Sequence, residues 1–69
     1  MDKESFKAFL VWLESASNDE LLEKQERLIE FRASAKDAHV KSDAHRFIRF
    51  IDEELLARAS VQEAERKHS

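Results

Sequence analysis

The chain has 69 residues and contains neither glycine nor proline. Glycine supplies the positive φ angles of tight hairpin turns, and proline interrupts helices. Without these residues the chain lacks the usual signals for β-hairpins and phosphate-binding loops, whereas nothing interrupts helix formation. Hydrophobic residues make up 42% of the chain and charged residues 39%, a balance that suits amphipathic helices and disfavours disorder. We therefore expect one small all-α domain.

Apolar residues recur at three- and four-residue spacing in three stretches, which predicts three amphipathic helices. The first spans about residues 3–16 and begins after Asp2, whose carboxylate can accept the first free backbone N–H groups. The second begins at Ser17, where the pattern Ser17-x-x-Glu20 fits a capping box. It is expected to fade over residues 33–36, where the apolar spacing lapses.

The third predicted helix is the longest. Asp37 is the preferred N-cap and Ser42 the alternative, and helix-favouring residues continue to about Lys67. The short connection between the first two helices indicates an antiparallel hairpin, along which the third helix returns. The sequence thus predicts a bundle of about three helices over residues 1–57, with residues 58–69 as a helical extension or frayed tail. The alternative is a two-helix hairpin that completes its core with a second chain.

The spacing also predicts which side chains face the core. The predicted inner faces are Phe6, Phe9, Leu10, Leu13 and Ala16, then Leu21, Leu22, Leu28 and Ile29, then Val40, Ala44, Phe47, Ile48, Ile51 and Leu55. Gln25 and Arg32 share the inner face of the second helix. Because a buried arginine is costly unless it is paired, Arg32 either emerges at the end of the bundle or pairs with Asp52 or Glu54, from the third helix or from a second subunit.

Composition and spacing give little support for catalysis. The chain has no cysteine, which excludes disulfides and thiolate metal ligands. His39 and Asp43 are four residues apart and are interpreted as a surface pair, because a metal site needs further ligands. No carboxylates are paired in an apolar setting, as general acid–base catalysis requires. We expect no enzyme activity, no cofactor, no metal and no small-molecule substrate.

Neither a membrane span nor a secretion signal is expected. No apolar run approaches the length of a transmembrane helix. The first residues, Met1 to Glu4, are acidic and mixed rather than basic and then apolar, unlike a signal peptide. A cytoplasmic protein is therefore the expectation.

Several large apolar side chains lie at the edges of the predicted stripes and favour a protein partner. A chain of 8.1 kDa without disulfides is marginal as an isolated domain, so the leading hypothesis is that it self-associates, most simply as a dimer, or docks on another protein. The predicted contact residues are Trp12, Phe31, Phe50 and Leu56, with Glu23, Glu26 and Glu30 supplying electrostatic steering. The predicted function is a small non-catalytic protein-interaction module.

A basic stripe on the third predicted helix carries the alternative function. Its members are Lys41, His45, Arg46 and Arg49, which could contact the phosphates of a nucleic acid. The formal net charge of −3 and the lack of a recognition-helix motif with a glycine turn weigh against this alternative.

Overall fold

The computed structural model describes residues 3–68, with side chains described over residues 3–63. It contains α1 (Lys3–Ser15), α2 (Asn18–Ser34) and α3 (Ala38–His68). Within the described residues every regular element is a helix, which confirms the predicted all-α bundle of three helices. Asp2, the predicted cap of α1, lies outside the described residues.

The helix boundaries follow from local hydrogen bonds. The Ser17 hydroxyl accepts the Glu20 backbone N–H at 3.1 Å, and the Glu20 carboxylate accepts the Ser17 N–H at 3.4 Å. This confirms the predicted capping box. Asp37 accepts the backbone N–H of His39 at 2.8 Å, so Asp37 rather than Ser42 caps α3. Between these helices the chain becomes extended at Ala35, within the segment where the second helix was expected to end.

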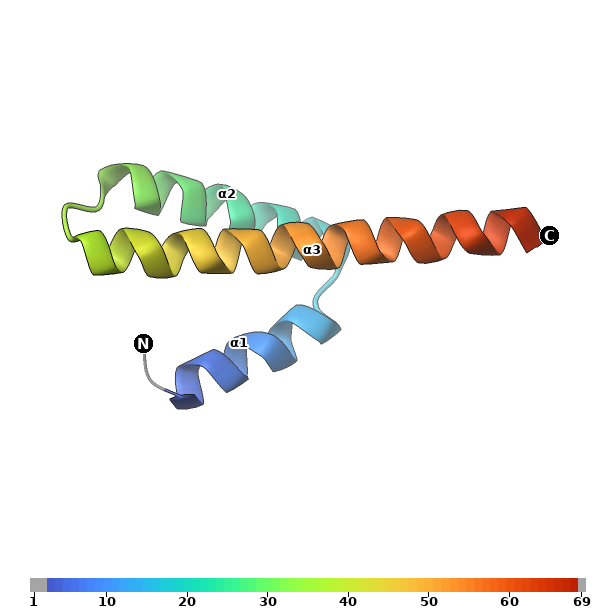
Figure 1. Ribbon diagram of the computed structural model, residues 1–69, viewed down its shortest axis with the longest axis horizontal. Helices are drawn as coiled ribbons and strands as arrows, with labels where there is room; N and C mark the ends of the chain where they lie inside the picture. The colour runs from blue at the N-terminus through green and yellow to red at the C-terminus, as the bar shows by residue number, and fades with distance from the viewer. Residues whose placement is uncertain (1–2, 69) are drawn as a thin grey trace.

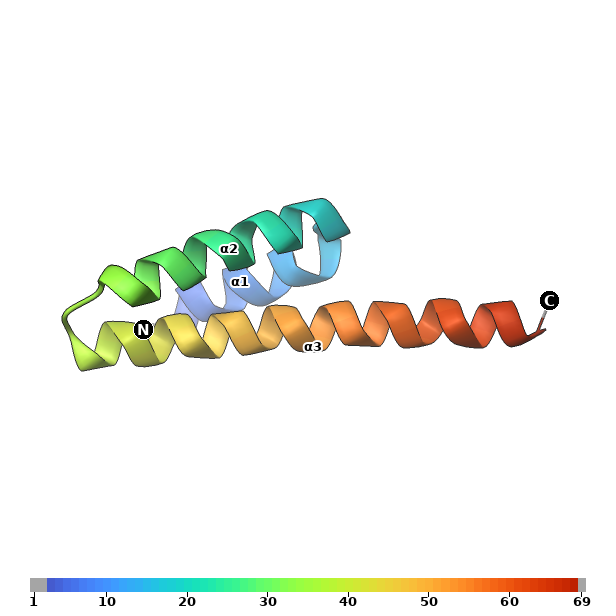
Figure 2. The same ribbon diagram turned by 90° about the horizontal axis from the view of Figure 1, so that it is seen from above.

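The closest helix pair is α2 and α3, which run antiparallel along each other. In Figure 1, α2 is seen above α3 and α1 below it, whereas Figure 2 shows that both α1 and α2 lie on the same side of α3, with α1 behind α2 in that view. The short connection makes α1 antiparallel to α2, as predicted, but α1 contacts mainly α3. The reason lies in its aromatic face, because Phe6 contacts Phe50 at 5.7 Å and Phe9 contacts Phe47 at 4.2 Å between ring centroids.

The core is small. Its buried hydrophobic side chains are Leu13, Ala16, Leu21, Ala44, Ile48 and Ile51, all of which were predicted to face inward. Two other predictions were wrong, because Leu22 is 52% exposed and Ile29 is 43% exposed. Both lie on one flank of the α2–α3 pair. Helix α1 packs against α3 on the other flank, so no described helix covers these two side chains.

Polar side chains join α2 to α3 along one edge of their contact. The Gln25 amide donates to the Asp52 carboxylate at 2.6 Å and to the Ile48 carbonyl oxygen at 3.3 Å. Arg32 lies 3.0 Å from Nδ1 of His45. Of the alternatives left open for Arg32, the pair with Asp52 or Glu54 of the same chain is not formed. Asp52 accepts from Gln25, Glu54 accepts from Arg58, and the Arg32 guanidinium contacts the His45 imidazole.

Arg58 ties the three helices together at the other end of the bundle. Its guanidinium donates to Glu54 on the same helix at 3.0 Å and to the side chain of Asn18 on α2 at 2.8 Å. It also donates to the backbone oxygens of Leu13 at 3.1 Å and Glu14 at 3.5 Å, at the end of α1. Local sequence patterns do not reveal this role of Arg58, because Asn18 and Leu13 lie 40 and 45 residues away from it along the chain.

The molecule is elongated, with extents of 49 × 24 × 16 Å and a radius of gyration of 14.1 Å. A compact chain of this length has a radius of gyration of about 11 Å. The accessible surface is 5608 Å². A compact protein of the same mass exposes about 4,500 Å², so this chain exposes an excess of about 1,100 Å².

Candidate functional site

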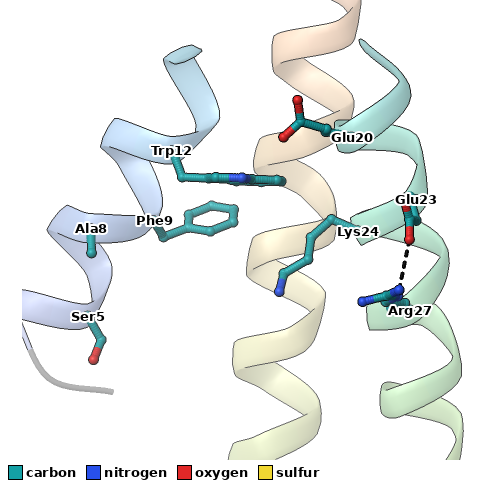
Figure 3. Close-up of a pocket in the computed structure, with 8 residues that line it drawn as sticks. All are labelled: Ser5, Ala8, Phe9, Trp12, Glu20, Glu23, Lys24 and Arg27. Carbon is teal, nitrogen blue, oxygen red and sulfur yellow. Dashed lines mark hydrogen bonds and ion pairs between the residues drawn. The ribbon is translucent and has the colours of Figure 1, made fainter. Parts of the chain in front are cut away.

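A groove lies between α1 and α2 in the described part of the chain, as Figure 3 shows. Its volume is about 470 Å³. Its lining residues are Ser5, Ala8, Phe9 and Trp12 from α1, with Glu20, Glu23, Lys24 and Arg27 from α2. We call this concavity the α1–α2 groove. It exists because α1 packs mainly onto α3, so that Ser5, Ala8 and Trp12 of α1 border an open space on the side toward α2.

Two aromatic rings form the apolar part of the groove. Trp12 lies over Phe9 with ring centroids 5.8 Å apart and an interplanar angle of 33°. Phe9 is in turn supported by Phe47 of α3. Both groove rings are half-buried, so their positions are set by packing and the apolar surface is formed before any partner binds. Ala8 beside them leaves room for a side chain from another molecule.

The α2 wall of the groove carries two acidic and two basic side chains. Glu23 accepts a hydrogen bond from Arg27 at 2.8 Å, and Glu20 belongs to the capping box of α2. Figure 3 shows Lys24 reaching from α2 toward α1. The exposed ion pair contributes at most about 1 kcal/mol to stability. The formal charges of this wall cancel, which suits a partner that presents both signs rather than a polyanion.

The four apolar residues predicted to contact a partner do not form one continuous edge. Trp12 lines the α1–α2 groove. Phe31 is 53% exposed and lies four residues after Arg27, so it extends the same wall of α2. Phe50 is half-buried and contacts the aromatic face of α1. Leu56 is exposed on α3, away from the groove residues.

The predicted acidic residues lie together. Glu23, Glu26 and Glu30 are exposed, and their three- and four-residue spacing places them on one stripe of α2. The stripe borders the groove at Glu23, which also pairs with Arg27. At this position the negative charges of the stripe can attract basic groups on a molecule in the groove.

The basic stripe of the alternative hypothesis is also exposed. Lys41, His45, Arg46 and Arg49 all lie on the solvent side of α3. The structure adds Arg32, which contacts His45 from α2. Among the described side chains, no group of three or more histidine, cysteine, aspartate or glutamate residues could hold a metal ion.

Comparisons with protein-family models, curated proteins and solved structures returned no match. Among the described helices, none has the length and apolar character needed to cross a membrane.

Proposed function

We propose that this protein is a small non-catalytic protein-interaction module whose α1–α2 groove receives a helix from a partner protein. The observation that carries the proposal is the groove itself, with its packed aromatic rings beside small side chains. In a four-helix bundle, helices enclose a shared core. Here α1, α2 and α3 supply three helices, and the groove lies where a fourth would pack against α1 and α2.

The groove defines the chemistry of its partner. An amphipathic helix binds such a groove through apolar residues at three- and four-residue spacing, which would lie against Phe9 and Trp12. Its flanks would carry both charges, because the α2 wall presents Lys24 beside Glu20. Basic residues on one flank would be attracted by the acidic stripe of α2, which raises the rate of encounter more than the affinity.

A matched pair of substitutions tests the proposal. Ala8→Trp fills the groove, whereas Val11→Trp adds the same ring to the exposed outer face of α1. Both variants and the original protein would be immobilised and exposed to the same cell lysate. The proteins that each one retains would be identified and compared by mass spectrometry. Some partner proteins should be retained by the original chain and by Val11→Trp but not by Ala8→Trp. A helical peptide from such a protein would then be added to the isotope-labelled original chain. We expect its amide shifts to concentrate on the groove residues.

Two results would contradict the proposal. In the first, Ala8→Trp and Val11→Trp retain the same proteins as the original chain. In the second, the amide shifts fall outside the groove. Binding that weakens steeply with salt and is lost on combining Lys41→Glu with Arg49→Glu would instead favour nucleic-acid binding by the basic stripe.

A further inference from the structure

We infer that two copies of this chain associate through a second surface, on the side of α2 opposite the groove. We call it the α2–α3 face and define it by Leu22, Ile29, Arg49, Asp52 and Leu56. All five side chains are exposed, and Leu56 reaches 67%. The association rests on this face alone and does not depend on the proposed function.

The helical phase of α2 separates this face from the groove. Leu21 is fully buried and marks the direction of the core. Leu22 and Ile29 lie about 80–100° from it in one direction around the helix, and Lys24 and Arg27 lie about 60–120° from it in the other. The two exposed aliphatic residues are therefore on the flank of α2 that faces away from the groove.

The matching flank of α3 is a stripe at four-, three- and four-residue spacing, formed by His45, Arg49, Asp52 and Leu56. Two of its members, His45 and Asp52, contact side chains of α2. Those two contacts place the whole stripe beside α2 on the same flank. The aromatic residues of α3 that contact α1 lie on its other flank. One continuous face therefore spans both helices.

The register between α2 and α3 makes this face complementary to itself. Asn18 contacts Arg58 and Arg32 contacts His45. Moving one residue forward along α2 therefore corresponds to moving about one residue backward along α3. A twofold axis that crosses the middle of α2, just after Gln25, therefore crosses α3 close to residues 50 and 51. A symmetric interface exchanges equivalent positions across such an axis.

This axis brings complementary groups together on both helices at once. On α2 it places Leu22 against the partner's Ile29, twice by symmetry. On α3 it places Arg49 against the partner's Asp52, also twice. Within the described residues Arg49 has no ion-pair partner, and Asp52 uses Oδ1 to accept from Gln25. Both charged groups are thus available for an ion pair between chains.

The elongated chain as a whole has enough exposed surface for an interface with a second copy. The chain exposes about 1,100 Å² more than a compact protein of its mass, and each partner in a standard interface buries about 800 Å². The α2–α3 face and the groove lie on opposite flanks of α2. A dimer would therefore carry two α1–α2 grooves that face outward. That each groove would bind one partner helix rests on the proposed function.

Sedimentation equilibrium over a range of chain concentrations tests the association with no ligand present. We expect a mass of twice 8.1 kDa at high concentration. Ile29→Glu should weaken the dimer at least about tenfold, which corresponds to losing one well-packed apolar contact on each side of the axis. Val11→Glu is the matched control, because Val11 is 68% exposed on α1 and outside both surfaces.

Charge reversal tests the register itself. In Arg49→Asp the axis opposes two carboxylates, and in Asp52→Arg it opposes two guanidinium groups, so each variant alone should dimerise more weakly than the original chain. Mixing the two variants should restore association, because the carboxylate introduced in one chain then meets the guanidinium introduced in the other. Circular dichroism would establish that both variants stay helical. A monomer at every concentration, or variants that fail to associate on mixing, would overturn the inference.

Discussion

Replacing Arg58 by alanine should destabilise the bundle more than any other exposed or half-exposed charge substitution. The guanidinium contacts all three helices, and its largest effect concerns the end of α1. The carbonyl oxygens of Leu13 and Glu14 lie in the last turn of α1, where backbone acceptors lack partners within the helix. Arg58 supplies hydrogen bonds and a positive charge at this helix end, both of which are stabilising there.

The magnitude follows from the three groups of contacts. Hydrogen bonds from a charged donor to the α1 carbonyls contribute about 1.5 kcal/mol, and the bond to Asn18 contributes about 1 kcal/mol. The pair with Glu54 adds about 0.5 kcal/mol, because the two side chains are only 23% and 27% exposed. Arg58→Ala should therefore cost about 3 kcal/mol. A chain of this length has a total stability of roughly 3–10 kcal/mol, so the effect is large.

Thermal and urea unfolding followed by circular dichroism measure this loss at one fixed chain concentration. A cost of this size should lower Tm by about 12–24 °C in a small domain. Trp12 emission reports separately on the position of α1, and we expect a shift to longer wavelength when Arg58 is removed. Arg46→Ala is the control, because Arg46 is exposed on the same helix. A difference between the two variants below about 0.5 kcal/mol would refute the reasoning.

Three further predictions use the same unfolding measurements. Leu21→Ala should cost about 3–5 kcal/mol, because the side chain is fully buried. Leu22→Ala should cost less than about 1 kcal/mol at a chain concentration low enough to keep the protein monomeric, because Leu22 is half exposed in the single chain. Equal costs under that condition would contradict the assigned core. Ser17→Ala should cost about 1 kcal/mol through loss of the capping box, and an unchanged urea midpoint would count against that role. Phe9→Ala should cost about 3–5 kcal/mol and shift Trp12 emission, since the two rings are in contact; unchanged emission would exclude that contact.

The helices could be predicted from sequence because their causes are local. The capping box needs only Ser17 and Glu20, three residues apart, and the cap of α3 needs only Asp37 and the following backbone. Most of the core was predictable for a similar reason, since spacing alone places Leu13, Leu21 and Ile51 on inner faces. The all-α class and the three helices therefore follow from interactions within one or two helical turns, and the same spacing indicates which residues are able to face a core.

The tertiary arrangement determined the rest. Leu22 and Ile29 satisfy the apolar spacing as well as Leu21 does, yet they are exposed, because α1 packs on the other flank of α3 and no described helix covers this flank of α2. The sequence left several positions open for Arg32, and within the chain its guanidinium contacts His45, because the antiparallel register decides which polar groups meet. These outcomes depend on where one helix lies relative to another. Helical spacing specifies the apolar face of a helix, but only the packing of all three helices decides how much of that face is covered.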